Sequence, residues 1–423
     1  MERLLVTGGA RCVGSVRVSG AKNSALKLMA AALLAPGRTV LRNVPRIDDC
    51  LTMGELLDRL GSGVVWHGDS VTSDATEITS VEAPYDLVRR MRASTAVLGS
   101  LLARAGRARV AMPGGDAIGS RPIDLHVQGL IKMGAEIGSE HGFLVAEARE
   151  LRGAAITLDY PSVGATENLM MAAVLARGTT AIDNAAREPE IADIADLLVS
   201  MGARIAGAGT STLEIEGVHA LVPADHATTP DRIETGTWAA AAVATRGEIT
   251  LENARPDHLD LFLQKLTDAG ADVAMTERGL HVRQPDRAKA IDFVTLPYPG
   301  VATDFQPIMM AMLATADGTS IATENVFESR FLYVDELRRM GADIRTEGHH
   351  AVIRGVPRLS AAPVRALDIR AGAAMAIAAL TAEGVTEISE LHHLDRGYEG
   401  FVEKLRALGV EVRRVEEPAF RLS

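Results

Sequence analysis

The chain has little cysteine, few aromatic residues and no long hydrophobic run. Its 423 residues include two cysteines, and aromatic residues make up 4% of the total. Two thiols supply neither a disulfide framework nor a four-cysteine zinc site, so Cys12 and Cys50 are predicted to be structural. No apolar run reaches the ~20 residues of a membrane-spanning helix, and the first residues lack the pattern of a signal peptide. We therefore expect a cytoplasmic protein.

Basic residues are outnumbered, with 44 lysines and arginines against 55 aspartates and glutamates. The formal net charge of −11 argues against nucleic acid and anionic membranes as partners. An anionic ligand would need a local positive site, which is feasible because exposed charges more than ~8 Å apart are screened at physiological salt. His349-His350 and His392-His393 lack the spacing and acidic companions of a metal site. No metal and no organic cofactor is expected, and the sequence does not set the oligomeric state.

What the sequence does contain is a repeat marked by glycine. Glycines that end helix-like segments and lead into strands recur 68 to 73 residues apart, at Gly61, Gly134, Gly202, Gly270, Gly341 and Gly409. A second series runs in step with the first and ends Ala/Leu/Met-rich segments, at Gly37, Gly106, Gly178, Gly247, Gly318 and Gly384. Glycine after an apolar helical pattern is a C-terminal cap, and the β-branched residues that follow indicate a strand. The chain is therefore predicted to be α/β, with six units of roughly 70 residues.

Each unit is expected to run helix, strand, helix, strand, with one or two further strands. The breaker-rich stretch Leu221–Pro230 falls between the third and fourth units, which favours two lobes over a solenoid or a closed ring. Two lobes with a cleft between them are a common geometry for ligand sites. The cores are expected to be aliphatic layers of helix on sheet.

Helices are expected to begin near the positions fourteen residues before the second series of glycines, and four of these six starts (Asn23, Arg92, Asp304 and Arg370) carry unusual chemistry. The positions are Asn23, Arg92, Gly164, Ile233, Asp304 and Arg370. Helix N-termini expose free N–H groups and partial positive charge, so they bind anions readily. Arginine at such a position opposes the helix dipole. Arg92 and Arg370 therefore predict a compensating anionic ligand.

A glycine-rich segment in the second unit is a candidate mobile loop. Residues 112–122 hold three glycines within six positions, together with one acid, Asp116, and one guanidinium, Arg121. A loop of this kind could close over a ligand, exclude water and deliver an acid. The alternative is a plain turn with solvated charges.

Together these motifs resemble the UDP-N-acetylglucosamine 1-carboxyvinyltransferases, the enolpyruvyl transferases that open peptidoglycan synthesis. The resemblance covers nearly the whole chain in order. It rests on Gly20–Asn23, Met91–Ser94, the loop at 112–126, Pro161–Thr166, Asn184–Glu190, Thr303-Asp304, Phe327–Phe331 and Asp395–Tyr398. It implies two lobes, each an inside-out α/β barrel of three units. One lobe would comprise residues 21–229 and the other residues 1–20 with 230–423, with the active site in the cleft between them.

The resemblance also implies the reaction and its residues. The enolpyruvyl group of phosphoenolpyruvate would pass to the 3′-hydroxyl of UDP-N-acetylglucosamine, with release of phosphate. Lys22, Arg121 and Arg396 would hold the donor phosphate and Arg370 its carboxylate, while Asp304 would take the hydroxyl proton. The nucleotide sugar would be bound by Asn23, Arg92, Arg121, Pro122, Ile123, Asp124, Leu125, His126, Ser162, Val163, Gly164, Asp304 and Val326. Arg330 also matches a family position, without an assigned role.

Asp116 departs from the pattern of many family members, which carry a cysteine that donates a proton to the methylene carbon and is alkylated by fosfomycin. Aspartate occurs there in some relatives. An ordinary aspartate is almost fully ionised at pH 7. It can donate only where bound anions and excluded water keep it protonated, which we expect in the closed complex. We expect catalysis by Asp116 and resistance to fosfomycin.

Other functions remain open. An enolpyruvyl transferase could act on another nucleotide acceptor in secondary metabolism, and a non-catalytic relative could bind a nucleotide sugar. A shikimate-type transferase fits the Lys22-Asn23 and loop motifs less well. Val301-Ala302 precede Thr303-Asp304 where relatives often place a bulky residue and proline, so the geometry of Asp304 is the least constrained part of the site.

Overall fold

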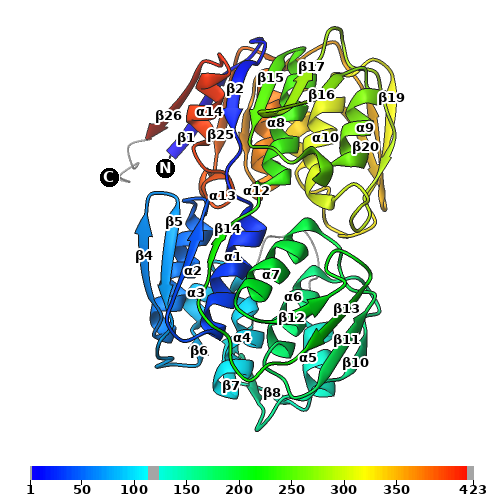
Figure 1. The fold of residues 1–423 in the computed structure, drawn as a ribbon. Coiled ribbons are helices and arrows are strands. Elements are labelled where there is room, and N and C mark those ends of the chain that lie inside the picture. The colour runs from blue at the N-terminus through cyan, green and yellow to red at the C-terminus, as the bar shows by residue number, and fades with distance from the viewer. Residues whose placement is uncertain (1, 113–122, 417–423) are drawn as a thin grey trace. The chain divides into compact units, whose positions relative to one another are not determined.

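The chain forms two compact units in the computed structural model, which describes residues 2–112 and 123–416 (Figure 1). One unit comprises residues 20–112 and 123–229, and the other comprises residues 2–19 and 230–416. Each unit encloses its own cluster of buried aliphatic side chains. The chain passes from one unit to the other after Ser19 and again after Thr229.

The repeat predicted from the glycines is confirmed. Three copies of helix, strand, helix and β-hairpin build each unit. The six turn glycines of the first series have φ between 82° and 104°, a region that residues with a Cβ rarely adopt. Gly247 is the exception in the second series, because its neighbour Arg246 takes the left-handed conformation instead. A Cβ on Gly247 would lie 2.2 Å from the carbonyl oxygen of Cys12, so close approach requires glycine there.

The unit of residues 20–229 contains the following elements. Its first repeat comprises α1 (Lys22–Ala31), η1 (Ala32–Leu34), β3 (Arg38–Arg42), α2 (Asp48–Leu60), β4 (Gly63–His67) and β5 (Ser70–Asp74). The second comprises β6 (Glu82–Ala83), α3 (Tyr85–Val88), η2 (Arg92–Ala96), α4 (Val97–Ala105), β7 (Arg107–Ala111), α5 (Asp124–Lys132), β8 (Glu136–Glu140) and β9 (Phe143–Glu147). The third comprises β10 (Ala155–Thr157), α6 (Val163–Ala173), β11 (Thr179–Asp183), α7 (Pro189–Ser200), β12 (Arg204–Ala206), β13 (Thr212–Glu216) and β14 (Asp225–Ala227).

The other unit repeats the pattern. Its first repeat comprises β2 (Val13–Arg17), α8 (Arg232–Thr245), β15 (Glu248–Glu252), η3 (Pro256–His258), α9 (Asp260–Asp268), β16 (Asp272–Thr276) and β17 (Gly279–Arg283). The second comprises β18 (Phe293–Val294), η4 (Thr303–Phe305), α10 (Gln306–Leu313), β19 (Thr319–Thr323), α11 (Val334–Arg339), β20 (Asp343–Glu347) and β21 (His350–Arg354). The third comprises β22 (Leu359–Ser360), β23 (Pro363–Arg365), α12 (Ile369–Leu380), β24 (Ala382–Glu383), β25 (Val385–Ser389), α13 (His392–Asp395), α14 (Phe401–Ala407), β26 (Val412–Glu416) and β1 (Glu2–Thr7).

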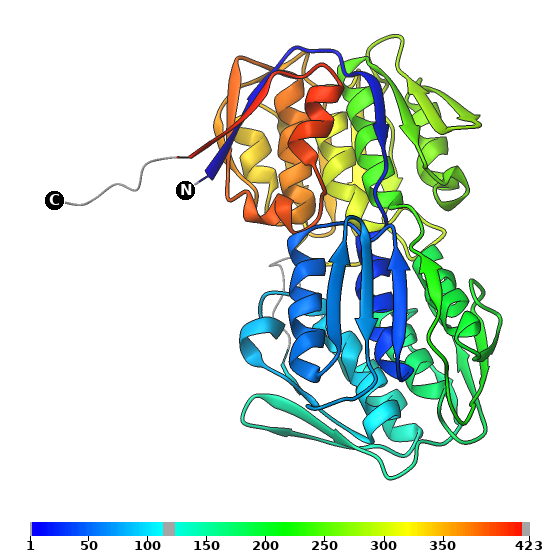
Figure 2. The same cartoon turned by 60° about the vertical axis from the view of Figure 1, so that its left-hand side comes forward.

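Each repeat contributes a four-stranded sheet of one topology. In the sheet β10-β11-β13-β12, the edge strand β10 pairs parallel with β11, and the hairpin β12–β13 is antiparallel. The ends of the chain complete the last sheet, where β1 lies between β25 and β26 with Leu4 opposite both Ile388 and Arg414. Figure 2 shows this dark-blue N-terminal strand beside the red C-terminal strand. In the other unit, β14 returns to pair with β3.

The helices lie inside each unit and the sheets lie outside, so each unit is an inside-out α/β barrel (Figure 1). All residues of α12 are buried, and so are all but one of α8, and beyond their first turns both helices consist mainly of small and apolar residues. Glycine lets the central helices approach closely. A Cβ on Gly99 of α4 would stand 2.2 Å from the carbonyl oxygen of Asn168 on α6. The prediction of aliphatic helix-on-sheet cores is confirmed.

Membrane insertion finds no support in the helices. Within residues 2–112 and 123–416, no helix combines the length and the apolar character needed to cross a bilayer.

Candidate active site

The predicted helix starts are confirmed to within one residue. The central helices or their leading 3₁₀ turns begin at Lys22, Arg92, Val163, Arg232, Thr303 and Ile369. The chemistry that the sequence places at these positions therefore stands at the N-terminal ends of buried helices. Such ends carry backbone N–H groups without intrahelical acceptors, which suits an anionic ligand.

Lys22 is a buried cation at the start of α1. Its side chain is 9% exposed, and its Nζ lies 2.8 Å from Oδ2 of Asp49 on α2, whose side chain is 5% exposed. A buried ammonium needs a counter-ion, and Asp49 supplies one. Asn23 is half-buried beside it. Asp49, in the first turn of α2, was not predicted from the sequence.

His126 and the start of α6 form a second group in the same unit. The Nδ2 of Asn168 lies 3.1 Å from Nδ1 of His126, while Oδ1 of Asn168 accepts from the backbone N–H of Gly99 at 2.9 Å. The backbone donor fixes the orientation of the amide, so its Nδ2 group faces Nδ1 of His126. A Cβ on Gly164 would stand 3.1 Å from this ring, so glycine lets the first turn of α6 lie against it.

The other residues of these two segments are more accessible. Ser162 caps α6, and its hydroxyl accepts from the N–H of Ala165 at 3.3 Å. Val163 is half-buried in the first turn. On the other segment, Ile123 and Leu125 are half-buried and Asp124 is exposed at the start of α5. Asp116, Arg121 and Pro122 lie outside the described residues, as does the side chain of Arg92.

In the unit of residues 2–19 and 230–416, Asp304 lies between two buried arginines. Arg370 Nε and Nη2 both lie 3.0 Å from Oδ2 of Asp304, and Nη2 of Arg330 lies 3.4 Å from Oδ1. The arginine side chains are 5% and 2% exposed, and that of Asp304 is 26% exposed. The structure thus brings the predicted base and the predicted carboxylate-binding arginine together, and it adds Arg330.

The charge on Arg370 is held by its surroundings. Burial alone would lower the pKa of Arg370, but the negative charge of Asp304, followed by Tyr398 and Asp231, outweighs it and raises the pKa above its usual range. Asp368 caps α12 by accepting from the backbone N–H groups of Arg370 and Ala371 at 2.8 and 2.9 Å. The arginine that opposes the helix dipole is therefore compensated by carboxylates of its own unit.

Two N–H groups of this cluster lack a partner among the described residues: Nε of Arg330 and Nη1 of Arg370. A buried donor left unpaired costs ~1–3 kcal/mol, so the cluster is suited to accept a further anion. Two guanidinium groups thus meet at one carboxylate, and guanidinium donors also recognise the carboxylate and phosphate groups of ligands.

The remaining predicted residues of this unit flank the cluster in sequence. The N–H of Val326 donates to Oε1 of Glu324 at 2.8 Å, which fixes the turn before Arg330. Arg396 directly follows α13 and is half-buried. Lys22, Asn23, His126 and Ser162–Gly164 belong to one unit, whereas Asp304, Val326, Arg370 and Arg396 belong to the other.

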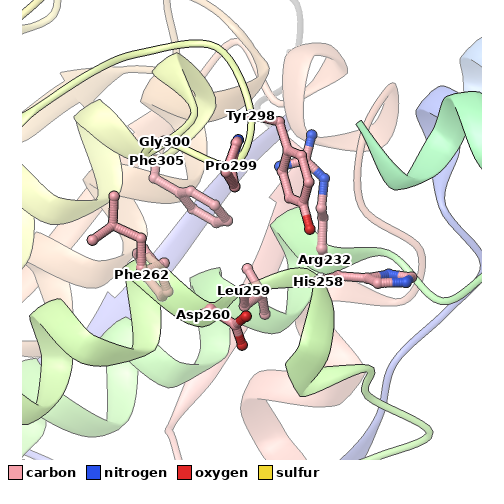
Figure 3. A pocket seen from close by; sticks show the side chains of 10 residues that line it. Arg232, His258, Leu259, Asp260, Phe262, Tyr298, Pro299, Gly300 and Phe305 are labelled. Atoms are coloured by element: carbon pink, nitrogen blue, oxygen red, sulfur yellow. The ribbon is translucent and has the colours of Figure 1, made fainter. Parts of the chain in front are cut away.

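A small pocket in the same unit as Asp304 contains none of the predicted binding residues. Its volume is ≈ 20 Å³, about the space of one water molecule. Figure 3 shows Arg232 and Tyr298 on one side of it. Phe262 stacks on Phe305 with ring centroids 4.2 Å apart. This pocket lies beside Arg232, the first residue of α8, and is too small for a substrate.

Both cysteines are buried, Cys12 in one unit and Cys50 in the other. Burial raises the pKa of the Cys12 thiol to about 11, although a hydrogen bond with Thr245 opposes the shift. The prediction that both are structural is therefore supported by their burial. Tyr160, two residues before the cap of α6, is 42% exposed, so it is not a buried packing residue.

The fold and this distribution of charged helix starts define a class of proteins. The family model of EPSP synthase (3-phosphoshikimate 1-carboxyvinyltransferase) matches residues 6–405. The chain therefore belongs to the EPSP synthase family of enolpyruvyl transferases.

Within that family, the chain is similar to proteins named UDP-N-acetylglucosamine 1-carboxyvinyltransferase. It is 55% identical to the one from Corynebacterium jeikeium over 98% of this chain and 99% of that protein. It is 54% identical to the one from Nocardia farcinica over the same shares of the two chains. Among solved structures, the enolpyruvyl transferase NikO from Streptomyces tendae has a TM-score of 0.88 at 28% identity and covers 99% of both chains. An EPSP synthase from Acinetobacter baumannii, at 17% identity and a TM-score of 0.76, shares the fold.

Proposed function

We propose that this protein transfers the enolpyruvyl group of phosphoenolpyruvate to the 3′-hydroxyl of UDP-N-acetylglucosamine with release of phosphate. This is the first committed step of peptidoglycan synthesis. The observation that carries the proposal is full-length identity above 50% to proteins named for this reaction. The cluster of Arg330, Arg370 and Asp304 supports it, because it joins an anion-binding fork to a carboxylate that can act as a base.

The donor is proposed to be held by cations. Arg370 would bind the carboxylate of phosphoenolpyruvate, and Lys22, Arg121 and Arg396 would bind its phosphate. Asp49 and Asp304 already neutralise Lys22 and Arg370. The donor must therefore displace these ion pairs or bind beside them. In either case its negative charges meet cations that already have a carboxylate partner within the protein.

The acceptor is proposed to lie against the helix starts. Asn23, Arg92 and Ser162–Gly164 would bind the nucleotide sugar, with Arg121–His126 on the uridine side and Asp304 and Val326 near the sugar. The N–H groups in the first turn of α6 suit the negative charge of a diphosphate. His126 lies against Gly164 in that turn and contacts the side chain of Asn168.

Asp304 is proposed to be the general base and Asp116 the acid. Asp304 takes the proton of the 3′-hydroxyl, and the sugar oxygen bonds to the substituted carbon of the donor. The methylene carbon takes a proton from Asp116. The double bond then re-forms as that methyl group loses a proton and phosphate departs. When the donor carboxylate engages Arg370, Asp304 loses one of its two arginines and becomes more basic.

An acceptor panel tests this function. Purified protein is supplied with phosphoenolpyruvate and, separately, with UDP-N-acetylglucosamine, other UDP-sugars, uridine nucleotides and shikimate 3-phosphate. We expect phosphate release with UDP-N-acetylglucosamine at a kcat/KM at least tenfold above any other acceptor. Faster release with a different nucleotide would favour the second candidate, an enolpyruvyl transferase of another pathway. The structural similarity to the enolpyruvyl transferase NikO is the reason to test this candidate. Acceptor binding without phosphate release would indicate a non-catalytic relative.

Asp116 gives a separate test of the acid. The variant Asp116→Asn should lose turnover, together with the acid limb of the pH profile, because an amide cannot donate this proton. Wild-type protein should resist fosfomycin because the loop carries no thiol. Full activity of the variant would place the proton donor elsewhere, and inactivation with labelling of Cys12 or Cys50 would contradict the account of resistance.

A further inference from the structure

A buried ion pair joins two helices whose N-terminal ends carry residues proposed to bind the nucleotide sugar. Lys27 lies on α1 and Glu167 on α6. Nζ of Lys27 lies 3.1 Å from Oε2 and 3.4 Å from Oε1 of Glu167, and it donates to the backbone carbonyl of Asn23 at 3.2 Å. The side chains are 13% and 0% exposed. The proposed reaction assigns neither residue a role.

The position of this pair matters more than its strength. Lys27 stands one turn after Asn23, and Glu167 stands one turn after the segment Ser162–Gly164. The ammonium group of Lys27 therefore contacts both the backbone carbonyl of Asn23 on α1 and the carboxylate of Glu167 on α6. Glu167 lies just behind the segment that is proposed to bind the nucleotide sugar. The ion pair therefore links α1 and α6 one turn behind their starts.

One oxygen of the Glu167 carboxylate has no hydrogen-bond donor among the described residues. The aligned hydrogen bond from Lys27 goes to Oε1, whereas Oε2 is closer to the ammonium but has no aligned donor among the described residues. Oε2 is therefore the oxygen that a proton can occupy. A protonated Glu167 no longer attracts Lys27 as an ion, and the hold on the ammonium weakens.

The charged groups around Glu167 favour such a change. Lys27 faces it from α1, Glu190 from the first turn of α7, and Glu188 from the cap of that helix. On α5, His126 contacts α6 at Gly164 and Asn168. Burial is the main cause that raises the pKa of Glu167 to about 7; Lys27 opposes this, while Glu190 and Glu188 add to it. The ionised form is therefore gained as pH rises through about 7.

We propose that Glu167, acting through Lys27, is a positioning residue for the nucleotide-sugar acceptor, and that its ionised form holds the starts of α1 and α6 at the spacing that binds this acceptor. The proposal rests on the proposed function. It makes acceptor binding, rather than the chemical step, the stage that responds to pH near neutrality. Glu167→Gln keeps an acceptor for Lys27 but cannot ionise, so it reproduces the protonated state at every pH.

The test compares the pH dependence of kcat and of the KM for UDP-N-acetylglucosamine between wild type and Glu167→Gln. In wild type, this KM should rise about fivefold or more as pH falls through 7. In the variant, KM should be high and flat across the same range, with kcat close to that of wild type. The matched control is Glu336→Gln, a change at a buried glutamate of α11 that pairs with Arg365; it should keep the wild-type profile.

A purely structural role gives a different result. Because burial raises the pKa of Glu167, its ionisation opposes folding, and wild type should lose stability relative to Glu167→Gln between about pH 4.5 and 7. If the variant shows this gain in stability but keeps the wild-type KM profile, the pair only supports folding and the proposal is overturned. The double variant Lys27→Met/Glu167→Met should fold and show a KM independent of pH; a wild-type profile there would also overturn it.

The wild-type profile separates the two proposals. Wild-type turnover of UDP-N-acetylglucosamine with an unchanged profile in Glu167→Gln refutes the positioning role and leaves the proposed function standing. Absence of wild-type turnover with this acceptor refutes both.

Discussion

At the scale of single residues, Asp304 carries the most specific chemistry. Two buried guanidinium groups contact its carboxylate, and a quarter of the side chain is exposed. A base of this kind is oriented but weak until one arginine finds another anion. The arrangement links donor binding to activation of the acceptor hydroxyl.

Replacement of Asp304 tests this link. Asp304→Asn retains the size of the side chain but cannot accept the proton, so kcat should fall by about 10²–10⁴-fold with UDP-N-acetylglucosamine. Asp335→Asn, on the exposed surface of α11, is the matched control and should keep wild-type activity. Steady-state phosphate release measures both. A loss of less than tenfold in Asp304→Asn would mean that another group is the base.

The sequence predicted some site residues and missed others for physical reasons. Arg370 is conspicuous because arginine opposes the dipole at a helix start, and the structure pairs it with Asp304. The contact between Asn168 and His126 could not be foreseen, since it joins α6 to α5 by tertiary packing alone. The same holds for Asp49 and for the Lys27–Glu167 pair, whose residue types are ordinary for helices.

At the scale of elements, glycine has two separate roles. Gly202, which follows α7, has φ of 104° with open space around its Cα. Gly99, within α4, has no such backbone requirement, but the carbonyl of Asn168 would stand 2.2 Å from an added Cβ. The glycine repeat identified turns of the first kind, whereas the second kind depends on how α4 packs on α6.

Alanine at each position separates these roles. Gly202→Ala should cost ~1–2 kcal/mol of unfolding free energy, from backbone strain alone, with activity retained. Gly99→Ala should cost more, because α4 and α6 must separate, and should raise the KM for the nucleotide sugar by disturbing Asn168 and His126. Urea unfolding and acceptor kinetics measure the two effects. Equal costs with unchanged KM in both variants would contradict this assignment.

At the scale of the whole molecule, the number of repeats and the position of every central helix followed from two glycine series. The sequence did not reveal that β1 completes the last sheet between β25 and β26, or that β14 closes the other unit on β3. Strand pairing between distant segments leaves little trace in local patterns. The pairing depends on which exposed sheet edge a strand from a distant part of the chain can reach and cover.

The two thiols report on the two units separately. Cys12 and Cys50 are fully buried in different cores, and the raised pKa of Cys12 leaves little thiolate at neutral pH. A thiol reagent should therefore label neither residue in the native protein. In rising urea, labelling should appear at each cysteine as its own unit unfolds, as followed by peptide mass spectrometry. Rapid labelling of either cysteine in buffer would show that its core opens in the native state.

The central claim is that the enolpyruvyl group is attached to one particular oxygen. The most direct measurement is the NMR and mass spectrum of the product formed from phosphoenolpyruvate and UDP-N-acetylglucosamine. The account predicts an enol ether on the 3′ oxygen of the sugar and one phosphate released for each product molecule. An unmodified nucleotide sugar after complete incubation, or an enolpyruvyl group on any other atom, would contradict it.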